Sequence, residues 1–271
     1  MPELSLDDGQ SVHFEDTGDG PPLLLVHGLG APSAFFARSV AELAHDHRVI
    51  TVDLRGHGAT PEGAEPVTVD RCAADLQALA EKLDVRGLTL LGWSLGATVA
   101  YRYLDRYGTD RVTGLISVEQ TPYLPSENGW EHAAFGGLDA AGVAEVDRLL
   151  SASDRATTEG LVRSFFAQGA TPAEELVDEL TSAATDCRSG AKRQLWQDAL
   201  RQDWRGRLPS LGVPVLFLHG ALSQIYPSAV GTWLADAVPG ARLQLFERSG
   251  HLPFLEEPER FHRAIRAWTA R

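Results

Sequence analysis

Short, almost continuous apolar runs recur along the chain and alternate with longer amphipathic segments. Runs of this kind are typical of strands in a parallel sheet that is covered on both faces. They occupy residues 21–28, 48–53, 88–93, 112–119, 214–220 and 241–247. Two further β-rich segments, 4–8 and 11–18, precede them, and Asp8-Gly9 is the predicted hairpin turn between these two.

Helical periodicity fills the intervals between the apolar runs. Apolar positions recur at helical spacing over residues 69–83. Near the end of the sequence, Phe261, Ile265 and Trp268 form one apolar stripe behind a helix start at Pro258. This alternation predicts an α/β fold with a mostly parallel, doubly wound sheet of about eight strands.

One long interval lacks any strand pattern and is expected to be an insertion. Residues 122–207 contain only helical segments, and we predict that they form a lid over the core domain built from residues 1–121 and 208–271. The lid would cover the carboxyl edge of the sheet, where open α/β sheets bind ligands. One of its helices is predicted to start at Thr171, with that hydroxyl as the cap and Pro172 in the first position.

Composition narrows the class of partner. The net charge of −13 argues against nucleic acid, because phosphate backbones are bound by clustered lysine and arginine. We find neither a secretory signal nor an apolar run near the ~20 residues needed to span a bilayer. Cys72 and Cys187 lack metal-type spacing, so reduced thiols and a cytoplasmic location are expected. A homodimer remains an open possibility.

A serine lies between two glycines where an apolar strand meets a small-residue helix. The sequence GWSLG at 92–96 fits the pattern G-x-S-x-G in the context that this motif requires. Glycines are needed because side chains two positions away would collide with neighbouring backbone. The tight turn lifts the Ser94 hydroxyl clear of the sheet, at the positive end of the next helix. Ser94 is therefore the predicted nucleophile, and an incidental serine in a glycine-rich turn is the alternative.

A serine hydroxyl needs a base to act as a nucleophile at neutral pH. Of the nine histidines, His251 is the best placed, because it follows the last predicted strand and so lies at the same sheet edge as Ser94. A second loop, VHGLG at 26–30, ends a strand in glycines. The N–H groups of Leu29 and Leu95 are predicted to form an oxyanion hole there.

With these motifs the chain resembles the α/β-hydrolases of the esterase and lactonase type. The resemblance covers nearly the whole length and rests on VHGLG, DLRGHG at 53–58, GWSLG, SGH at 249–251 and the insertion after the sixth strand. The family order of nucleophile, acid and histidine is obeyed by Ser94 and His251. The resemblance implies that Asp53 and Arg55 belong to a structural turn.

The family usually carries its acid in an H-G-x-x-D-x-x-x-P pattern, and here Ser223 occupies the place of the aspartate. Losing a triad carboxylate typically costs about 10⁴ in turnover. Glu119 ends the neighbouring strand, ~4.8 Å away, and is the predicted replacement. A few members, zearalenone lactonases among them, are similar in taking a glutamate from this strand. One alternative is that Glu119 caps the first helix of the lid or pairs with an arginine. Another is that a lid carboxylate such as Asp139 is the acid.

The sequence therefore predicts a cofactor-free serine hydrolase, without a metal, that cleaves a carboxylic ester or lactone. Its substrate is expected to be small, largely apolar and without strong negative charge, because the lid is aromatic and net acidic. The alternatives are C–C bond hydrolysis, perhydrolysis, a non-hydrolytic cyclisation, or a small-molecule receptor with a weakened triad. The predicted substrate contacts are Gly28, Trp93, Trp130 and Tyr226.

Overall fold

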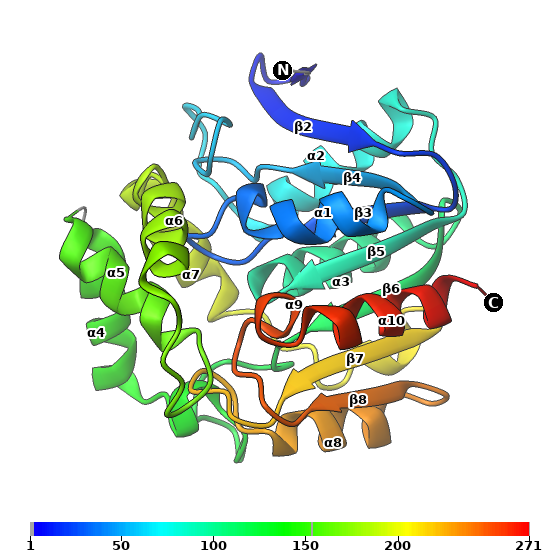
Figure 1. Ribbon diagram of the computed structural model, residues 1–271. Helices are drawn as coiled ribbons and strands as arrows, with labels where there is room; N and C mark the ends of the chain where they lie inside the picture. The colour runs from blue at the N-terminus through cyan, green and yellow to red at the C-terminus, as the bar shows by residue number, and fades with distance from the viewer. Residues whose placement is uncertain (1–2, 153, 271) are drawn as a thin grey trace.

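In the computed structural model, which describes residues 3–152 and 154–270, eight strands form one sheet (Figure 1). Its order is β1-β2-β4-β3-β5-β6-β7-β8. Strand β2 is antiparallel to β1 and β4, and all other neighbouring pairs are parallel, which confirms the predicted α/β class. The strands are β1 (Glu3–Ser5), β2 (Ser11–Thr17), β3 (Pro22–Val26), β4 (Arg48–Val52), β5 (Leu88–Trp93), β6 (Val112–Val118), β7 (Val215–Gly220) and β8 (Arg242–Phe246).

Helices cover both faces of this sheet, which explains why its central strands are apolar at almost every position. In β3, the side chains of Leu24 and Val26 join the core beneath α2 (Val69–Lys82), α3 (Leu95–Tyr107) and α8 (Ala229–Ala237). Those of Leu23 and Leu25 join the opposite core beneath α1 (Ala37–Leu43), α9 (Pro253–Glu256) and α10 (Pro258–Thr269). The helices predicted at 69–83 and from Pro258 are confirmed, the first ending one residue earlier.

Four α-helices lie between β6 and β7, and no strand occurs there among the residues that are described. They are α4 (Ala140–Ser151), α5 (Arg155–Ser164), α6 (Glu174–Thr185) and α7 (Ser189–Ala199). Figure 1 shows them gathered beyond the carboxyl ends of the parallel strands. The predicted helix start at Thr171 is wrong, because Ala173 is the N-cap of α6 and no side chain caps it. Glu174 and Glu175 occupy the first turn instead, where carboxylates favour the positive helix end.

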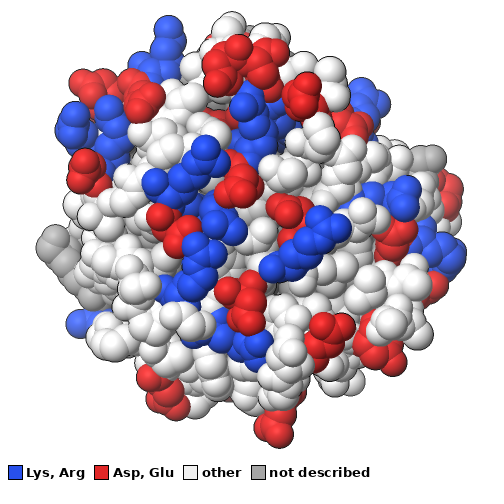
Figure 2. Space-filling model, turned by 180° about the vertical axis from the view of Figure 1, so that it is seen from behind, with Lys and Arg blue, Asp and Glu red and all other residues white. Residues whose placement is uncertain are grey.

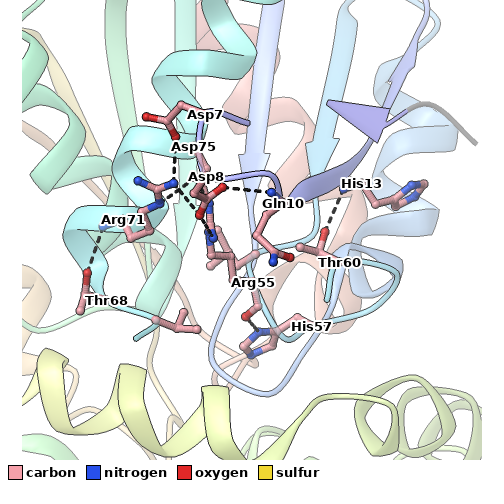
Figure 3. A network of polar contacts seen from close by, with 12 residues as sticks. Asp7, Asp8, Gln10, His13, Arg55, His57, Thr60, Thr68, Arg71 and Asp75 are labelled. Carbon is pink, nitrogen blue, oxygen red and sulfur yellow. Dashed lines mark hydrogen bonds and ion pairs between the residues drawn. The ribbon is translucent and has the colours of Figure 1, made fainter. Parts of the chain in front are cut away.

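A buried ion-pair network ties the N-terminal hairpin to the core (Figure 3). Arg55 follows β4, and its side chain is only 1% exposed. Its guanidinium donates to both carboxylate oxygens of Asp75 on α2, at 2.7 and 2.9 Å, and to Asp8 in the hairpin turn at 2.6 Å. The hydrogen bond from Arg55 is the main reason that the pKa of Asp8 is lowered to about 2. Arg55 thus holds three segments together, as the structural turn implied by the resemblance requires.

The surface and the cysteines bear on the expected partners. On the face seen in Figure 2, acidic and basic side chains interleave and form no large patch of one sign. Both cysteines are buried free thiols. Within residues 3–152 and 154–270, no helix is both long and apolar enough to cross a membrane.

Candidate active site

Ser94 lies on a strained turn between β5 and α3. Its backbone angles are φ 53° and ψ −125°, in a region that residues other than glycine rarely adopt. Flanking glycines allow this geometry, because a Cβ on Gly92 would collide with the backbone of Ala97, and one on Gly96 with the carbonyl oxygen of Val26. Ser94 is the one partly exposed residue between buried neighbours. The turn therefore presents its hydroxyl to the cavity described below.

Glu119 follows the last residue of β6 and is completely buried. It also has a left-handed backbone conformation, with φ 48°. His251 Nδ1 donates to Glu119 Oε2 at 2.9 Å, and the Ser223 hydroxyl donates to the same oxygen at 2.7 Å. The other carboxylate oxygen accepts from the backbone N–H of Gly220 at 2.8 Å. Every one of these partners comes from outside β6, so the carboxylate is fixed by the end of β7 and by the loops that follow β7 and β8.

The environment of Glu119 keeps its carboxyl group ionised. Burial alone would raise its pKa, but the imidazoles of His219 and His251 outweigh this effect and lower the pKa to about 2. His219 Nδ1 lies 3.4 Å from the carboxylate and makes no hydrogen bond in the described structure. A full negative charge beside His251 is what stabilises a transient imidazolium.

His251 is held in place by its backbone and by three aromatic rings. Its N–H donates to the carbonyl oxygen of Phe165 at 2.7 Å, and its carbonyl oxygen accepts from Trp93 Nε1 at 2.8 Å. The imidazole packs between Trp93, Phe165 and Tyr226, with ring centroids 5.3 to 5.5 Å away. Because Phe165 follows α5, the inserted helices help to position this histidine.

A second carboxylate, Glu256 on α9, stabilises the loop of His251. Its oxygens accept from the N–H of Ala167 at 2.7 Å and from the N–H of Gly250 at 2.8 Å. Burial raises the pKa of Glu256 to about 7, and the backbone N–H donors only partly offset this. The protonation state of Glu256 is therefore expected to change near neutral pH. Glu256 lies five positions after His251 in the sequence.

Two backbone N–H groups at the cavity wall remain available to a bound oxygen. Neither Leu29, after β3, nor Leu95, at the start of α3, donates its N–H to any acceptor in the described parts of the chain. The loop of Leu29 is braced by His57, whose Nε2 accepts from the N–H of Gly30 at 2.9 Å. Burial lowers the pKa of His57 to about 3, so its ring stays neutral and keeps the lone pair that this brace requires.

One cavity connects these groups. Its empty volume is about 970 Å³, a figure that includes the open mouth. Ser94, His251, Leu29 and Leu95 all line it, together with the predicted contacts Gly28, Trp93 and Tyr226. Gln120, directly after Glu119, also lines it and had no signal of its own in the sequence.

Two residues singled out from the sequence lie elsewhere. Trp130, predicted to contact substrate, does not line this cavity, and its ring packs edge-on against Trp233 of α8 at 4.9 Å. Asp139, the alternative acid, is exposed and caps α4 by accepting from the N–H of Gly142 at 2.9 Å. Glu119 itself has no arginine partner among the described residues.

Sequence reasoning missed three contributors besides Gln120. Gly220 and Ser223 were known only as part of the altered acid motif, and their donation to Glu119 depends on side-chain geometry. Lys192 of α7 lines the cavity although nothing in its local sequence indicates this.

In residues 3–152 and 154–270, no three His, Cys, Asp or Glu side chains are grouped so that they could hold a metal ion.

Comparison with known proteins agrees with this fold. The family model described as alpha/beta hydrolase fold matches residues 21–258. A pimeloyl-[acyl-carrier protein] methyl ester esterase of Nitrosomonas europaea is 31% identical over 93% of this chain and 96% of its own length. A putative non-heme chloroperoxidase of Synechocystis is 28% identical over 89% of this chain and 88% of its own. An esterase of Exiguobacterium antarcticum superposes with a TM-score of 0.90 at 27% identity, covering 99% of both chains. The chain therefore belongs to the α/β-hydrolase family and is a serine hydrolase.

Proposed function

We propose that this protein cleaves a carboxylic ester or lactone through an acyl-enzyme on Ser94, with His251 as general base and acid and Glu119 as the orienting acid. The observation that carries this proposal is the 2.9 Å hydrogen bond between Glu119 and His251, whose ring lines the same cavity as Ser94. No cofactor takes part in the proposed reaction.

The proposed reaction proceeds in two halves. In the first, Ser94 Oγ attacks the carbonyl carbon while His251 Nε2 accepts its proton, and the N–H groups of Leu29 and Leu95 stabilise the oxyanion. The tetrahedral intermediate expels the alcohol, which takes the proton from His251. In the second half, His251 activates a water molecule that attacks the acyl-enzyme and releases the acid. Glu119 holds the imidazole in the required tautomer throughout.

The cavity wall supports a small and largely apolar substrate. Helices α4, α5 and α7 contribute apolar side chains, so we propose that residues 122–207 act as a lid that excludes water from the reaction. Gly28, Trp93 and Tyr226 are the proposed substrate contacts from the core. The apolar residues that these three helices contribute are Val146, Leu150, Leu161, Val162 and Trp196.

The decisive experiment replaces the nucleophile. We expect Ser94→Ala to lower kcat for 4-nitrophenyl butanoate by about 10⁴-fold or more while the protein stays folded. Ser210→Ala, at an exposed serine outside the cavity, is the matched control and should retain full activity. A fluorophosphonate probe should label the wild type on Ser94 alone, which also separates a hydrolase from a receptor with a weakened triad. Wild-type activity in Ser94→Ala would reject the proposal.

Perhydrolysis is a second candidate, favoured by the relative named as a putative non-heme chloroperoxidase. In that reaction hydrogen peroxide takes the place of water, attacks the acyl-enzyme and leaves as a peroxy acid while Ser94 regains its proton. Mass spectrometry of the products formed in the presence of hydrogen peroxide decides between a carboxylic acid and a peroxy acid.

Location and assembly are also proposals. We infer a cytoplasmic enzyme because the sequence uses only two cysteines, and we retain the homodimer suggested at the outset. Light scattering of the purified chain measures its molar mass and therefore tests the homodimer directly.

A further inference from the structure

Lys192 is the one charged residue of the Lys, Arg, Asp and Glu classes among the described residues that line the cavity. The rest of the wall is apolar or neutral apart from the titratable ring of His251. This is unexpected in a chain with a net charge of −13 and only two lysines. A single cation in an apolar cavity favours a ligand that carries a negative charge.

Lys192 is largely buried, and its ammonium group has no partner among the described residues, although Nζ itself is not fully enclosed. The residue is 5% exposed, and its Nζ forms no hydrogen bond or ion pair with any residue in the described chain. Burial lowers the pKa of this ammonium, and the neighbouring Cys187 acts weakly in the opposite direction. A buried charge is costly unless a hydrogen-bonding counter-charge satisfies it. The missing counter-charge is therefore expected to arrive with a ligand.

The position of Lys192 relates this cation to the reacting groups. Its Cδ lies 3.4 Å from the place that a Cβ on Gly30 would occupy. Gly30 directly follows Leu29, whose N–H is a proposed oxyanion donor. A carboxylate bound by Lys192 therefore shares the cavity with the scissile carbonyl and lies on the side of the 26–30 loop.

We propose that Lys192 is a specificity-determining residue that binds a carboxylate of the substrate. The preferred substrate is then a half-ester of a dicarboxylic acid, or a lactone that bears a carboxylate, with a hydrocarbon segment against the apolar wall. This inference rests on the proposed ester hydrolysis at Ser94. It revises the expectation of a substrate without negative charge, which was based on the acidity of the lid as a whole and not on the side chains that face the cavity.

The test uses two esters that are matched in acyl length. Methyl hexanoate is neutral, and monomethyl adipate ends in a carboxylate. The wild type is expected to have the higher kcat/KM for monomethyl adipate. Lys192→Met should lower this value by about 10- to 100-fold, mainly through KM, because a charge-assisted hydrogen bond is lost. The same variant should change kcat/KM for methyl hexanoate by less than about threefold.

Lys82→Met is the matched control, because Lys82 is the only other lysine in the sequence and lies exposed on α2. Lys82→Met should leave kcat/KM for both esters unchanged. Lys192→Gln keeps a polar side chain without the charge and serves as a second variant if the methionine variant folds poorly. An equal loss on both esters in the Lys192 variants, or a wild-type preference for methyl hexanoate, overturns the proposal.

Binding measurements separate this inference from the proposed hydrolysis. In Ser94→Ala, which cannot turn over, calorimetry should show monomethyl adipate binding at least about 10-fold more tightly than in Ser94→Ala/Lys192→Met. If this difference is found but the wild type hydrolyses neither ester, the carboxylate site stands and the hydrolysis proposal fails. If both esters are hydrolysed but binding does not depend on Lys192, the inference fails and the hydrolysis proposal stands.

Discussion

The hydroxyl of Ser223 donates a hydrogen bond to Glu119 Oε2 at 2.7 Å, and the same oxygen accepts from His251 Nδ1 at 2.9 Å. Ser223 occupies the place where the family resemblance leads one to expect an aspartate. The serine therefore has a structural role, because its hydroxyl stabilises the carboxylate of Glu119, which comes from the end of the adjacent strand. Glu119 reaches the imidazole from the tip of β6, and Ser223 approaches the same point from the tip of β7.

Replacing Glu119 tests the role of its charge. Glu119→Gln preserves the volume of the side chain and an acceptor for the N–H of Gly220, but it removes the charge beside His251. We expect kcat for 4-nitrophenyl butanoate to fall by about 10⁴-fold, with a melting temperature that still shows a folded protein. An unchanged kcat would exclude Glu119 as the orienting acid.

Moving the acid to the other strand tests the geometry. Ser223→Asp alone places two carboxylates against each other, so it should reduce both stability and activity by like-charge repulsion. In the Glu119→Gln background the same change should restore kcat by at least about 10-fold, because the aspartate then faces the imidazole alone. Values of kcat for the wild type, the two single variants and the double variant form a double-mutant cycle. Additive losses, without recovery in the double variant, would show that the two strand tips are not interchangeable.

The Arg55 network is expected to contribute mainly to stability. Arg55→Met leaves the buried carboxylate of Asp75 without its partner, so the free energy of unfolding should fall by about 3–5 kcal/mol. Arg55→Met/Asp75→Leu should recover most of this loss, because the buried pair is then gone and Asp8 keeps its ion pair with Arg71. The control is Arg38→Met, which breaks an exposed pair with Glu179 and should cost about 0–1 kcal/mol. Urea unfolding measures all three, and a loss below about 1 kcal/mol in Arg55→Met contradicts the assignment.

Glu256 predicts a pH dependence of stability. Its pKa is raised from 4.5 in the unfolded chain to about 7 in the fold, so folding favours the protonated carboxyl. The resulting stabilisation is complete below pH 4.5 and is lost as the pH rises through about 7. Glu256→Gln mimics the neutral carboxyl, and its stability relative to the wild type should rise between these two pH values. Thermal unfolding measured across this range checks the sign, and a constant difference would contradict it.

The architecture could be predicted because both faces of the sheet are covered. Continuous apolar runs such as the one at 214–220 are read as strands whatever their neighbours are. The start of α6 was placed too early because Thr171 and Pro172 resemble a capped helix start, whereas the first turn is set by Glu174 and Glu175. Local patterns therefore predict which helices and strands exist more reliably than they predict the residue at which a given helix begins.

Site residues could be predicted where strand order decides their position. Glu119 and Ser94 end adjacent parallel strands, so their neighbourhood follows from the order of β5, β6 and β7. Trp130 could not be placed in this way, since its partner Trp233 lies on α8, about a hundred positions further along the chain. Lys192 was missed for a different reason, because a lysine on an amphipathic helix is usually read as solvated.

The shared oxygen of Glu119 has a consequence for how such enzymes are recognised. We expect that a carboxylate can reach the same point in space from either of two strand ends. Its position in the sequence can then differ between proteins while its position in the fold stays the same. A search template that insists on an aspartate behind β7 would dismiss this chain as inactive. Screening genomes by the spatial neighbourhood of the histidine instead would retain it, because Glu119 is the proposed acid and lies beside His251.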